Sequence, residues 1–241
     1  MKKYLIAAAF AALCFAQGAK AQTNLQTFYD AGREYATTTF EMFKSDNWGN
    51  TFFFIDHYYS TKGQNELSPA RSAINGSYFE IERALNFWQD TKLAPVSAHL
   101  EYDGSTWGNG VFCVGANYFL HSKDYNNTLT LYAMYEHMTG YGSADLPIKI
   151  SAVWGMQDLF GVTGLRFNGF LDFWGNNTSY LGLGVDDTHF SLLTEPQLWY
   201  NIGQHFNCEN LHIGGEVELS YNFAGNNGFM CNPCVGAKWV F

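Results

Sequence analysis

Acidic residues recur at every second position in several apolar stretches of the chain. His99, Glu101 and Asp103 alternate with apolar residues, and Glu80 and Glu82 show the same spacing. Side chains two residues apart on a β-strand point to the same face of the sheet. A face of carboxylates with an occasional basic group can hydrogen-bond hydroxyl groups or attract cations.

The same alternation collects ionisable and polar residues along most of the chain. The side chains expected on this face are Glu80, Glu82, His99, Glu101, Asp103, Glu136, Arg166, Asp172, His189, Glu195, Gln197, His212, Glu216, Glu218 and Lys238. Acids dominate, so a pore with this lining favours cations or neutral hydrogen-bonding solutes over anions. An alternative is that many of the groups pair as struts that fill a small barrel. Arg83 is out of step, and we expect a bulge near Glu82 to turn it inward.

Two further groupings could carry chemistry. Cys231 and Cys234 have CxxC spacing, but zinc needs a second ligand pair and a redox site needs a helix after the motif, so a disulfide or packed thiols fits better. Asp186, Asp187 and His189 are similar to a surface-protease set, yet aspartates are ordinary turn residues. We therefore expect no catalytic residue, no metal and no cofactor.

Strands must position these residues, because helical periodicity is nearly absent. Twelve candidate strands lie near 24–30, 33–44, 50–60, 77–88, 96–103, 110–121, 128–138, 147–158, 164–174, 188–200, 209–222 and 230–241. Short turns between them alternate with longer links, of which 61–76 and 175–187 are the longest. This layout is typical of an outer-membrane barrel. The predicted fold is all-β: a closed antiparallel transmembrane β-barrel of about twelve strands.

The first 21 residues have the pattern of a secretory signal peptide. Lys2 and Lys3 precede an apolar run, and Ala19-Lys20-Ala21 forms a small-x-small cleavage site before Gln22. The prediction is export, cleavage near Ala21/Gln22, and a single barrel domain over residues 22–241. Without the three signal lysines, 10 basic and 22 acidic residues remain, a balance that argues against a nucleic-acid polymer as partner.

Composition separates a membrane barrel from a soluble one. Aromatic residues make up 18% of the chain and charged residues only 15%, against about 25% charged in an average soluble domain. Aromatic pairs fall near expected strand ends, at Phe87-Trp88, Phe173-Trp174 and Trp199-Tyr200, with Trp239 near the end of the chain. Such rings suit membrane interfaces. A soluble periplasmic sandwich or lipocalin-like barrel is the alternative.

The last residues carry a separate signal. Gly236, Trp239 and Phe241 have the spacing of the outer-membrane assembly signal, to which this segment is similar, although Cys234 stands at its usual polar position. The expected partners are the outer-membrane assembly machinery and the lipid bilayer.

Three aromatic segments resemble a known family. Residues 47–56, 78–82 and 167–175 resemble parts of the nucleoside-specific channel-forming (Tsx-like) outer-membrane proteins, and the whole mature chain is similar to a Tsx-related group of unassigned function. The resemblance implies a monomeric twelve-stranded barrel of a Gram-negative outer membrane, whose rings stack on bases while carboxylates bind sugars. It adds Asp56 and Trp174 to the solute-binding candidates beside Glu80, Glu82 and Asp172.

The expected function is passive uptake of small neutral or cationic solutes, nucleosides among them. A closed structural or surface-contact barrel is the alternative, and a barrel enzyme is less favoured.

Overall fold

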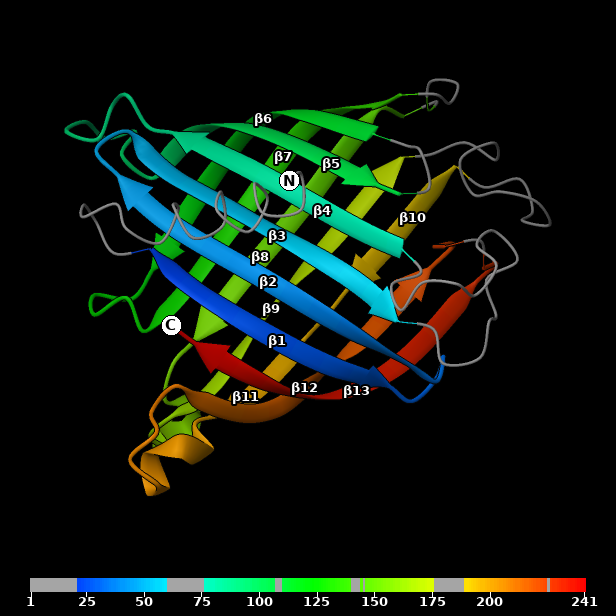
Figure 1. Ribbon diagram of the computed structural model, residues 1–241. Helices are drawn as coiled ribbons and strands as arrows, with labels where there is room; N and C mark the ends of the chain where they lie inside the picture. The colour runs from blue at the N-terminus through cyan, green and yellow to red at the C-terminus, as the bar shows by residue number, and fades with distance from the viewer. Residues whose placement is uncertain are drawn as a thin grey trace, which may run out of the picture.

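The protein forms one antiparallel sheet. The computed structural model describes residues 21–59, 76–106, 110–139, 144, 146–175, 189–224 and 226–241. Its strands are β1 (Gln22–Asp30), β2 (Tyr35–Asp46), β3 (Gly49–Tyr59), β4 (Gly76–Leu85), β5 (Val96–Ser105), β6 (Gly110–His121), β7 (Asn127–Thr139), β8 (Ile148–Met156), β9 (Leu165–Gly175), β10 (Phe190–Thr194), β11 (Gln197–Tyr200), β12 (Leu211–Tyr221) and β13 (Phe229–Val240). Successive strands lie side by side around the sheet (Figure 1).

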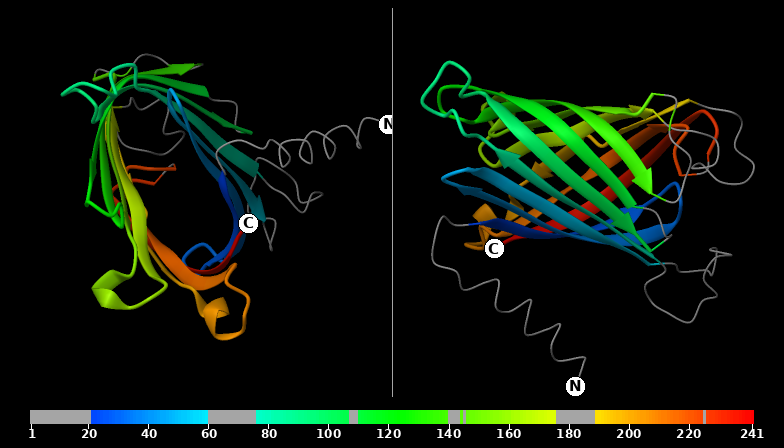
Figure 2. Two further views of the ribbon diagram at one scale, coloured as in Figure 1. Left: turned by 90° about the vertical axis from the view of Figure 1, so that its left-hand side faces the viewer. Right: turned by 90° about the horizontal axis from the view of Figure 1, so that it is seen from above.

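The sheet closes on itself, because β1 pairs with β13 from Asn24↔Val240 to Asp30↔Cys234. The end-on view in Figure 2 shows the ring. β10 and β11 are two parts of one barrel strand, since both pair with β9 and β12 in a continuous register. Pro196 lies between them and has no N–H to donate. The barrel therefore has twelve strands, and the predicted fold is confirmed.

The two ends of the barrel carry different connections. The C-terminus lies at the same end as the turn 47–48, the connections 86–95 and 122–126, and the short helices η1 (Leu159–Gly161) and η2 (Ile202–His205) (Figure 1). The predicted signal peptide and most of the two longest predicted loops lie outside the described residues. Among the described residues, no helix is long and apolar enough to cross a membrane.

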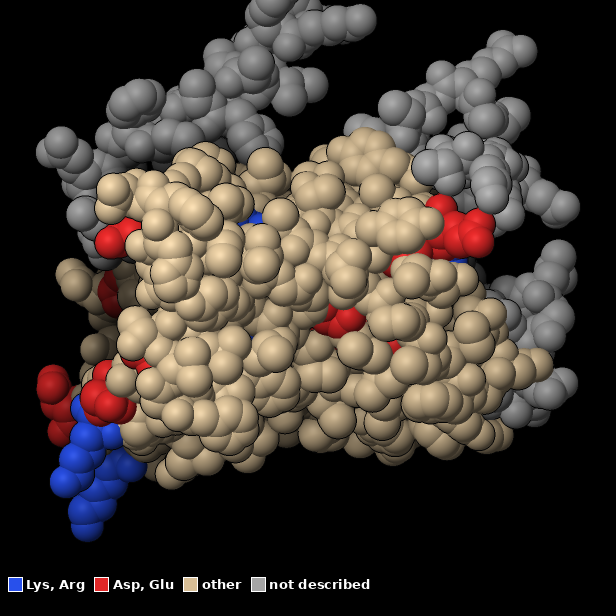
Figure 3. All heavy atoms as spheres, turned by 90° about the horizontal axis from the view of Figure 1, so that it is seen from below, with Lys and Arg blue, Asp and Glu red and all other residues tan. Residues whose placement is uncertain are grey.

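The outer face of the barrel is apolar. Large exposed side chains on it are Leu25, Phe79, Ile81, Leu100, Phe112, Val114, Leu131, Tyr135, Ile150, Leu198, Ile213 and Val235. On the face seen in Figure 3, charged side chains are few and most lie toward the two ends. Such a surface matches the hydrocarbon of a bilayer, which the alternating strands predicted.

Aromatic rings gather near both rims of this face. Phe190 stacks between Phe173 and Tyr221, with ring centroids 5.4 and 5.6 Å apart. At the other end, Phe87 contacts Trp48 at 6.1 Å. These rings fit the predicted interface belts.

Trp174 and Trp199 belong to aromatic pairs predicted near the interfaces, and both lie inside the barrel. This agrees with the predicted lumen position of Trp174 and corrects the prediction for Trp199. Trp174 and Trp199 are buried, with 7% and 1% of their surface exposed. Position along the strand correctly placed them near strand ends, but their even or odd position in the register turns their rings inward.

The predicted bulge at Glu82 is wrong. β4 pairs with β3 and with β5 in an unbroken register, so Arg83 stays on the outer face opposite Thr51 and Leu100. Its guanidinium donates to both carboxylate oxygens of Asp46, at 2.7 and 2.9 Å. Because Arg83 lies near the end of β4, it satisfies its charge at the rim without a change of register.

The four cysteines within the described residues are all free thiols. Cys231 and Cys234 are three residues apart on β13, so their side chains point to opposite faces. Cys231 is exposed and Cys234 is buried. A disulfide between them is therefore excluded. The thiol of Cys234 packs against Phe28 and Trp199, whereas that of Cys231 lies on the outer face.

Candidate solute-binding lumen

All ten predicted lumen residues lie on the inner face: Asp56, Glu80, Glu82, Glu101, Arg166, Asp172, Trp174, Glu195, Glu216 and Glu218. Cross-strand pairs share a face, and the pairings join these residues to the buried polar set that includes Asp30, His99, Asp103 and Lys149. Their alternation with lipid-facing residues was correctly predicted from the period of two. Their role in binding a solute stays a prediction.

Acids outnumber bases inside the barrel. Of the described residues, twelve acids lie on the inner face: Asp30, Glu41, Asp56, Glu80, Glu82, Glu101, Asp103, Glu136, Asp172, Glu195, Glu216 and Glu218. Four cations oppose them, namely Arg33, Lys149, Arg166 and Lys238. The interior therefore carries a negative potential, which low-dielectric walls strengthen.

Four of the acids form two directly opposed pairs, which we call the acidic square. Glu80 on β4 is the cross-strand partner of Asp103 on β5, and Glu82 is the partner of Glu101. Like charges directly opposite one another destabilise a sheet, so this arrangement needs compensation.

Lys149 supplies part of that compensation. From β8 it reaches across two strands, placing Nζ 2.6 Å from Glu101 Oε1 and 3.4 Å from Asp172 Oδ2. His99 Nε2 lies 3.2 Å from the other oxygen of Glu101 and 3.6 Å from Glu82. Glu101 is thus held from two sides, whereas the rest of the square has fewer partners.

An apolar cluster lies beside this charged wall. Trp174 packs with Val111, Cys113, Met134 and Met138, and Phe223 meets its ring edge-on at 5.8 Å. The cluster encloses most of Trp174, which leaves little of its π-face open to the lumen.

Half-buried aromatic rings line the wall next to the acidic square. Phe54 on β3 is the cross-strand partner of Glu80, and Phe52 is the partner of Glu82. The Phe54 ring lies 6.0 Å from Phe52 and 5.7 Å from Tyr78. Two residues along β3, Asp56 accepts hydrogen bonds from Thr39 at 2.5 Å and from Tyr58 at 3.3 Å.

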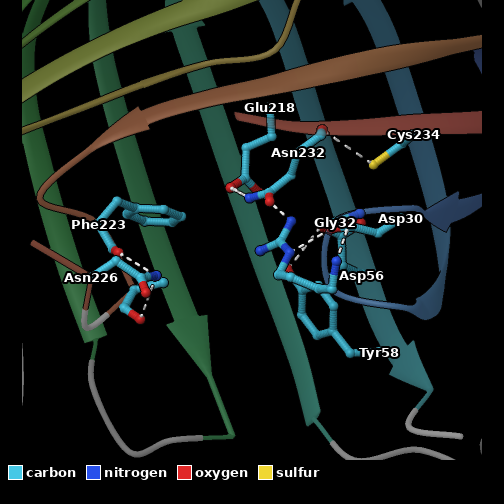
Figure 4. A network of polar contacts seen from close by, with 11 residues as sticks. Asp30, Gly32, Asp56, Tyr58, Glu218, Phe223, Asn226, Asn232 and Cys234 are labelled. Carbon is cyan, nitrogen blue, oxygen red and sulfur yellow. Dashed lines mark hydrogen bonds and ion pairs between the residues drawn. The ribbon is translucent and has the colours of Figure 1, made fainter. Parts of the chain in front are cut away.

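A second polar network surrounds Arg33, which belongs to the turn between β1 and β2. Its guanidinium lies 2.5 Å from Asp30 and 2.6 Å from Glu218. Asn232 donates to the other oxygen of Glu218 at 3.0 Å. Figure 4 shows Asp30, Glu218 and Asn232 of this network, which come from β1, β12 and β13. The turn is thereby fastened to the inner wall.

A third group contains the remaining bases. The ammonium of Lys238 lies 4.1 Å from the ring centroid of Trp199, whose cross-strand partner is Arg166. On β1, Gln26 donates to Glu41 at 3.1 Å. Charges of both signs are therefore present inside, and two of the bases, Lys149 and Arg33, form ion pairs with acids.

The family model described as "Domain of unknown function (DUF5020)" matches residues 22–241, which is nearly the whole chain. The chain belongs to this family. No curated protein matches its sequence.

Solved structures place the DUF5020 fold among porins. The NanC porin matches with a TM-score of 0.53 and 9% identity, covering 90% of this chain and 98% of that one. The KdgM porin matches with a TM-score of 0.50 and 8% identity, covering 91% and 99%. At such low identity the likeness shows the fold alone, which is that of outer-membrane porin barrels.

The most important lumen residue that the sequence did not single out in this DUF5020 chain is Lys149. It lies in a segment that alternates from Ile148 to Met156, so its face could have been predicted from the same period of two. The position of Arg33 could not have been predicted in this way. It lies in a turn, where the alternation of a strand does not determine which way a side chain points.

Proposed function

We propose that this protein is a monomeric channel of the outer membrane of a Gram-negative bacterium, through which small neutral or cationic solutes diffuse passively. The proposed route to the membrane is export, cleavage near Ala21/Gln22 and insertion by the outer-membrane assembly machinery. The observation that carries the proposal is the excess of carboxylates on the inner face of a closed barrel with an apolar outer face. No catalytic role is proposed for any residue.

The degree of exposure inside the barrel supports a lumen with free space. Phe43 faces inward as the partner of Phe52, yet 39% of its surface is exposed. The side chains of Glu82 and Asp172 are 13% and 15% exposed, while Glu101 beside them is 3% exposed. Water reaches some of the acids, and a mobile cation would meet them on its path.

The proposal predicts cation preference in planar bilayers. Under a potassium chloride gradient, we expect the reversal potential to lie toward the potassium equilibrium potential, because the lining repels chloride. Replacing both Glu195 and Glu216 with Gln should move it toward zero. The matched control, Asp90→Asn with Glu209→Gln, removes two charges from exposed connections and should leave it unchanged. Anion preference in the parent, or equal effects of the two variants, would contradict the proposal.

Nucleosides are a finer proposal for the solute. The structure offers Phe54 beside Glu80, so a base could stack on the ring while a sugar hydroxyl donates to the carboxylate. Stacking on an aromatic side chain contributes about 1 to 3 kcal/mol per base in nucleic-acid complexes. Trp174 is 7% exposed, so its predicted stacking role is limited to the small part of its surface that its own cluster leaves uncovered.

Added nucleoside should reduce the single-channel current, and Phe54→Ala should weaken this block. Phe53→Ala is the matched control, since its ring lies on the opposite face of the same strand. Equal weakening by both variants would show that the ring itself is not the contact, and absence of block in the parent would remove nucleosides as solutes.

A structural barrel without transport is the second candidate. The observation that favours it is the pair of internal struts, Lys149 with Glu101 and Arg33 with Glu218, which hold distant strands together. A purified, folded protein that gives no conductance above the bare bilayer would establish this alternative.

A further inference from the structure

We propose that the acidic square binds one divalent cation, with oxygens of Glu80, Glu101 and Asp103 as protein ligands and Ca²⁺ as the cation its chemistry fits. The sequence led us to expect no metal, because Cys231 and Cys234 lack the second ligand pair that zinc needs. The proposed site is independent of the proposed channel, since it needs only the folded barrel.

The geometry suits a single ion. Glu80, Glu101 and Asp103 each offer one carboxylate oxygen, and these three oxygens lie within 4.8 Å of one another. Calcium–oxygen distances are about 2.4 Å, so two ligands of one ion lie at most about 4.8 Å apart. The side chains come from adjacent positions of β4 and β5, where the barrel backbone fixes them.

Asp103 gives an independent sign of a missing partner. It is 6% exposed, and its oxygen Oδ1 is buried without a hydrogen-bond partner. Its cross-strand neighbours on the inner face are Glu80 and Val111, neither of which carries a donor on its side chain when Glu80 is ionised. A buried carboxylate oxygen without a donor is costly, and a cation removes that cost.

The charges around the acidic square also favour a bound cation. Lys149 is the one ammonium group that the described structure places within ion-pair distance of this wall, and it engages Glu101 and Asp172. Glu80, Glu82 and Asp103 then remain as three acids without a basic partner of their own, apart from the 3.6 Å contact of Glu82 with His99. One divalent ion would neutralise two of these charges.

The ligand types select the cation. Glu80, Glu101 and Asp103 provide oxygen only, which suits hard cations such as Ca²⁺ and disfavours thiol-seeking metals. Ca²⁺ accepts six to eight ligands at flexible angles, so waters can complete its shell where the square opens to the lumen through the half-buried Glu80. Zinc would be expected instead at Glu82, His99 and Glu101, which form an alternative set.

The test is Ca²⁺ titration of the purified, refolded barrel in detergent by isothermal titration calorimetry. We expect one Ca²⁺ per chain. Asp103→Asn and Glu80→Gln, each nearly isosteric, should weaken binding by about tenfold or more, equal to about 1.4 kcal/mol. Glu216→Gln removes an acid from the opposite part of the same lumen and should leave the affinity unchanged. A gel shift between unheated and boiled samples verifies that each variant is folded.

A second measurement keeps the test decisive if a variant fails to fold. The hydroxyl of Tyr78 lies 3.4 Å from Glu80, so Tb³⁺ bound in the square should show tyrosine-sensitised luminescence. Added Ca²⁺ should displace the Tb³⁺ and lower this luminescence, and Tyr78→Phe should lower it as well. No Ca²⁺ binding to the parent at millimolar concentration would overturn the proposal. So would Zn²⁺ binding in preference to Ca²⁺, or equal weakening by Glu216→Gln, which would indicate a diffuse charge effect. A barrel that binds Ca²⁺ but conducts nothing would refute the channel and leave this site standing.

Discussion

Removing Phe241 should leave little or no assembled protein in the outer membrane. The backbone N–H of Phe241 donates to Thr23 at 2.9 Å, so the last residue extends the seam between β13 and β1. Its side chain is 66% exposed and makes little contact within the barrel. We therefore expect the aromatic ring to act on assembly rather than on the stability of the finished fold. The measurement is the heat-shifted band of the folded barrel in outer-membrane fractions.

Two point variants separate the ring from the backbone. Phe241→Ala keeps the hydrogen bond to Thr23 and should still assemble poorly, whereas Phe241→Tyr should assemble normally. Phe229→Ala is the matched control, because Phe229 begins the same strand and is 65% exposed. Normal levels of the chain lacking Phe241 would show that the assembly signal lies elsewhere.

Replacing Lys149 with Met should strongly destabilise the folded barrel. The change keeps the length of the side chain but leaves Glu101 and Asp172 without their cation on a crowded acidic wall. Removal of one partner from a buried ion pair costs about 3 to 5 kcal/mol, since the other charge remains buried. Urea titration of the refolded protein, followed by tryptophan fluorescence and the gel shift, measures the loss.

The origin of that loss is tested by a second change and a control. Adding Glu101→Gln to Lys149→Met should restore part of the stability, because the uncompensated charge is then removed. Lys238→Met should cost less, since Lys238 lies against the Trp199 ring. A double variant as unstable as the single one would show that packing, not charge, explains the effect.

The faces of the strands could be predicted from the sequence because a membrane barrel enforces a strict alternation. Lipid on one side and polar groups on the other leave no freedom of register, so His99, Glu101 and Asp103 had to share a face. The number of strands also followed, even where Pro196 divides one of them. The end of a strand is less constrained, which is why Arg83 and Trp199 were misjudged.

The contacts between side chains from different parts of the barrel wall could not be predicted in the same way. Lys149 and Glu101 lie three strands apart around the ring, and their meeting depends on the curvature of the wall. Arg33 and Glu218 are separated by 185 residues and meet only because the barrel closes. Periodicity gives the direction of a side chain but not its distance from another one.

Closure of β1 on β13 makes the order of the strands circular. Asn24 and Val240 are paired, so the start of β1 and the end of β13 lie side by side, at the end of the barrel that carries η2. A short linker could therefore join residue 241 to residue 22. New ends opened within the η2 connection would give a circular permutant with every strand pairing retained. In that permutant the terminal aromatic would become an internal residue at the old seam. Whether this permutant is assembled in the outer membrane would then show which feature assembly requires. One possibility is the closed sheet alone, and the other is an aromatic residue at the very end of the polypeptide.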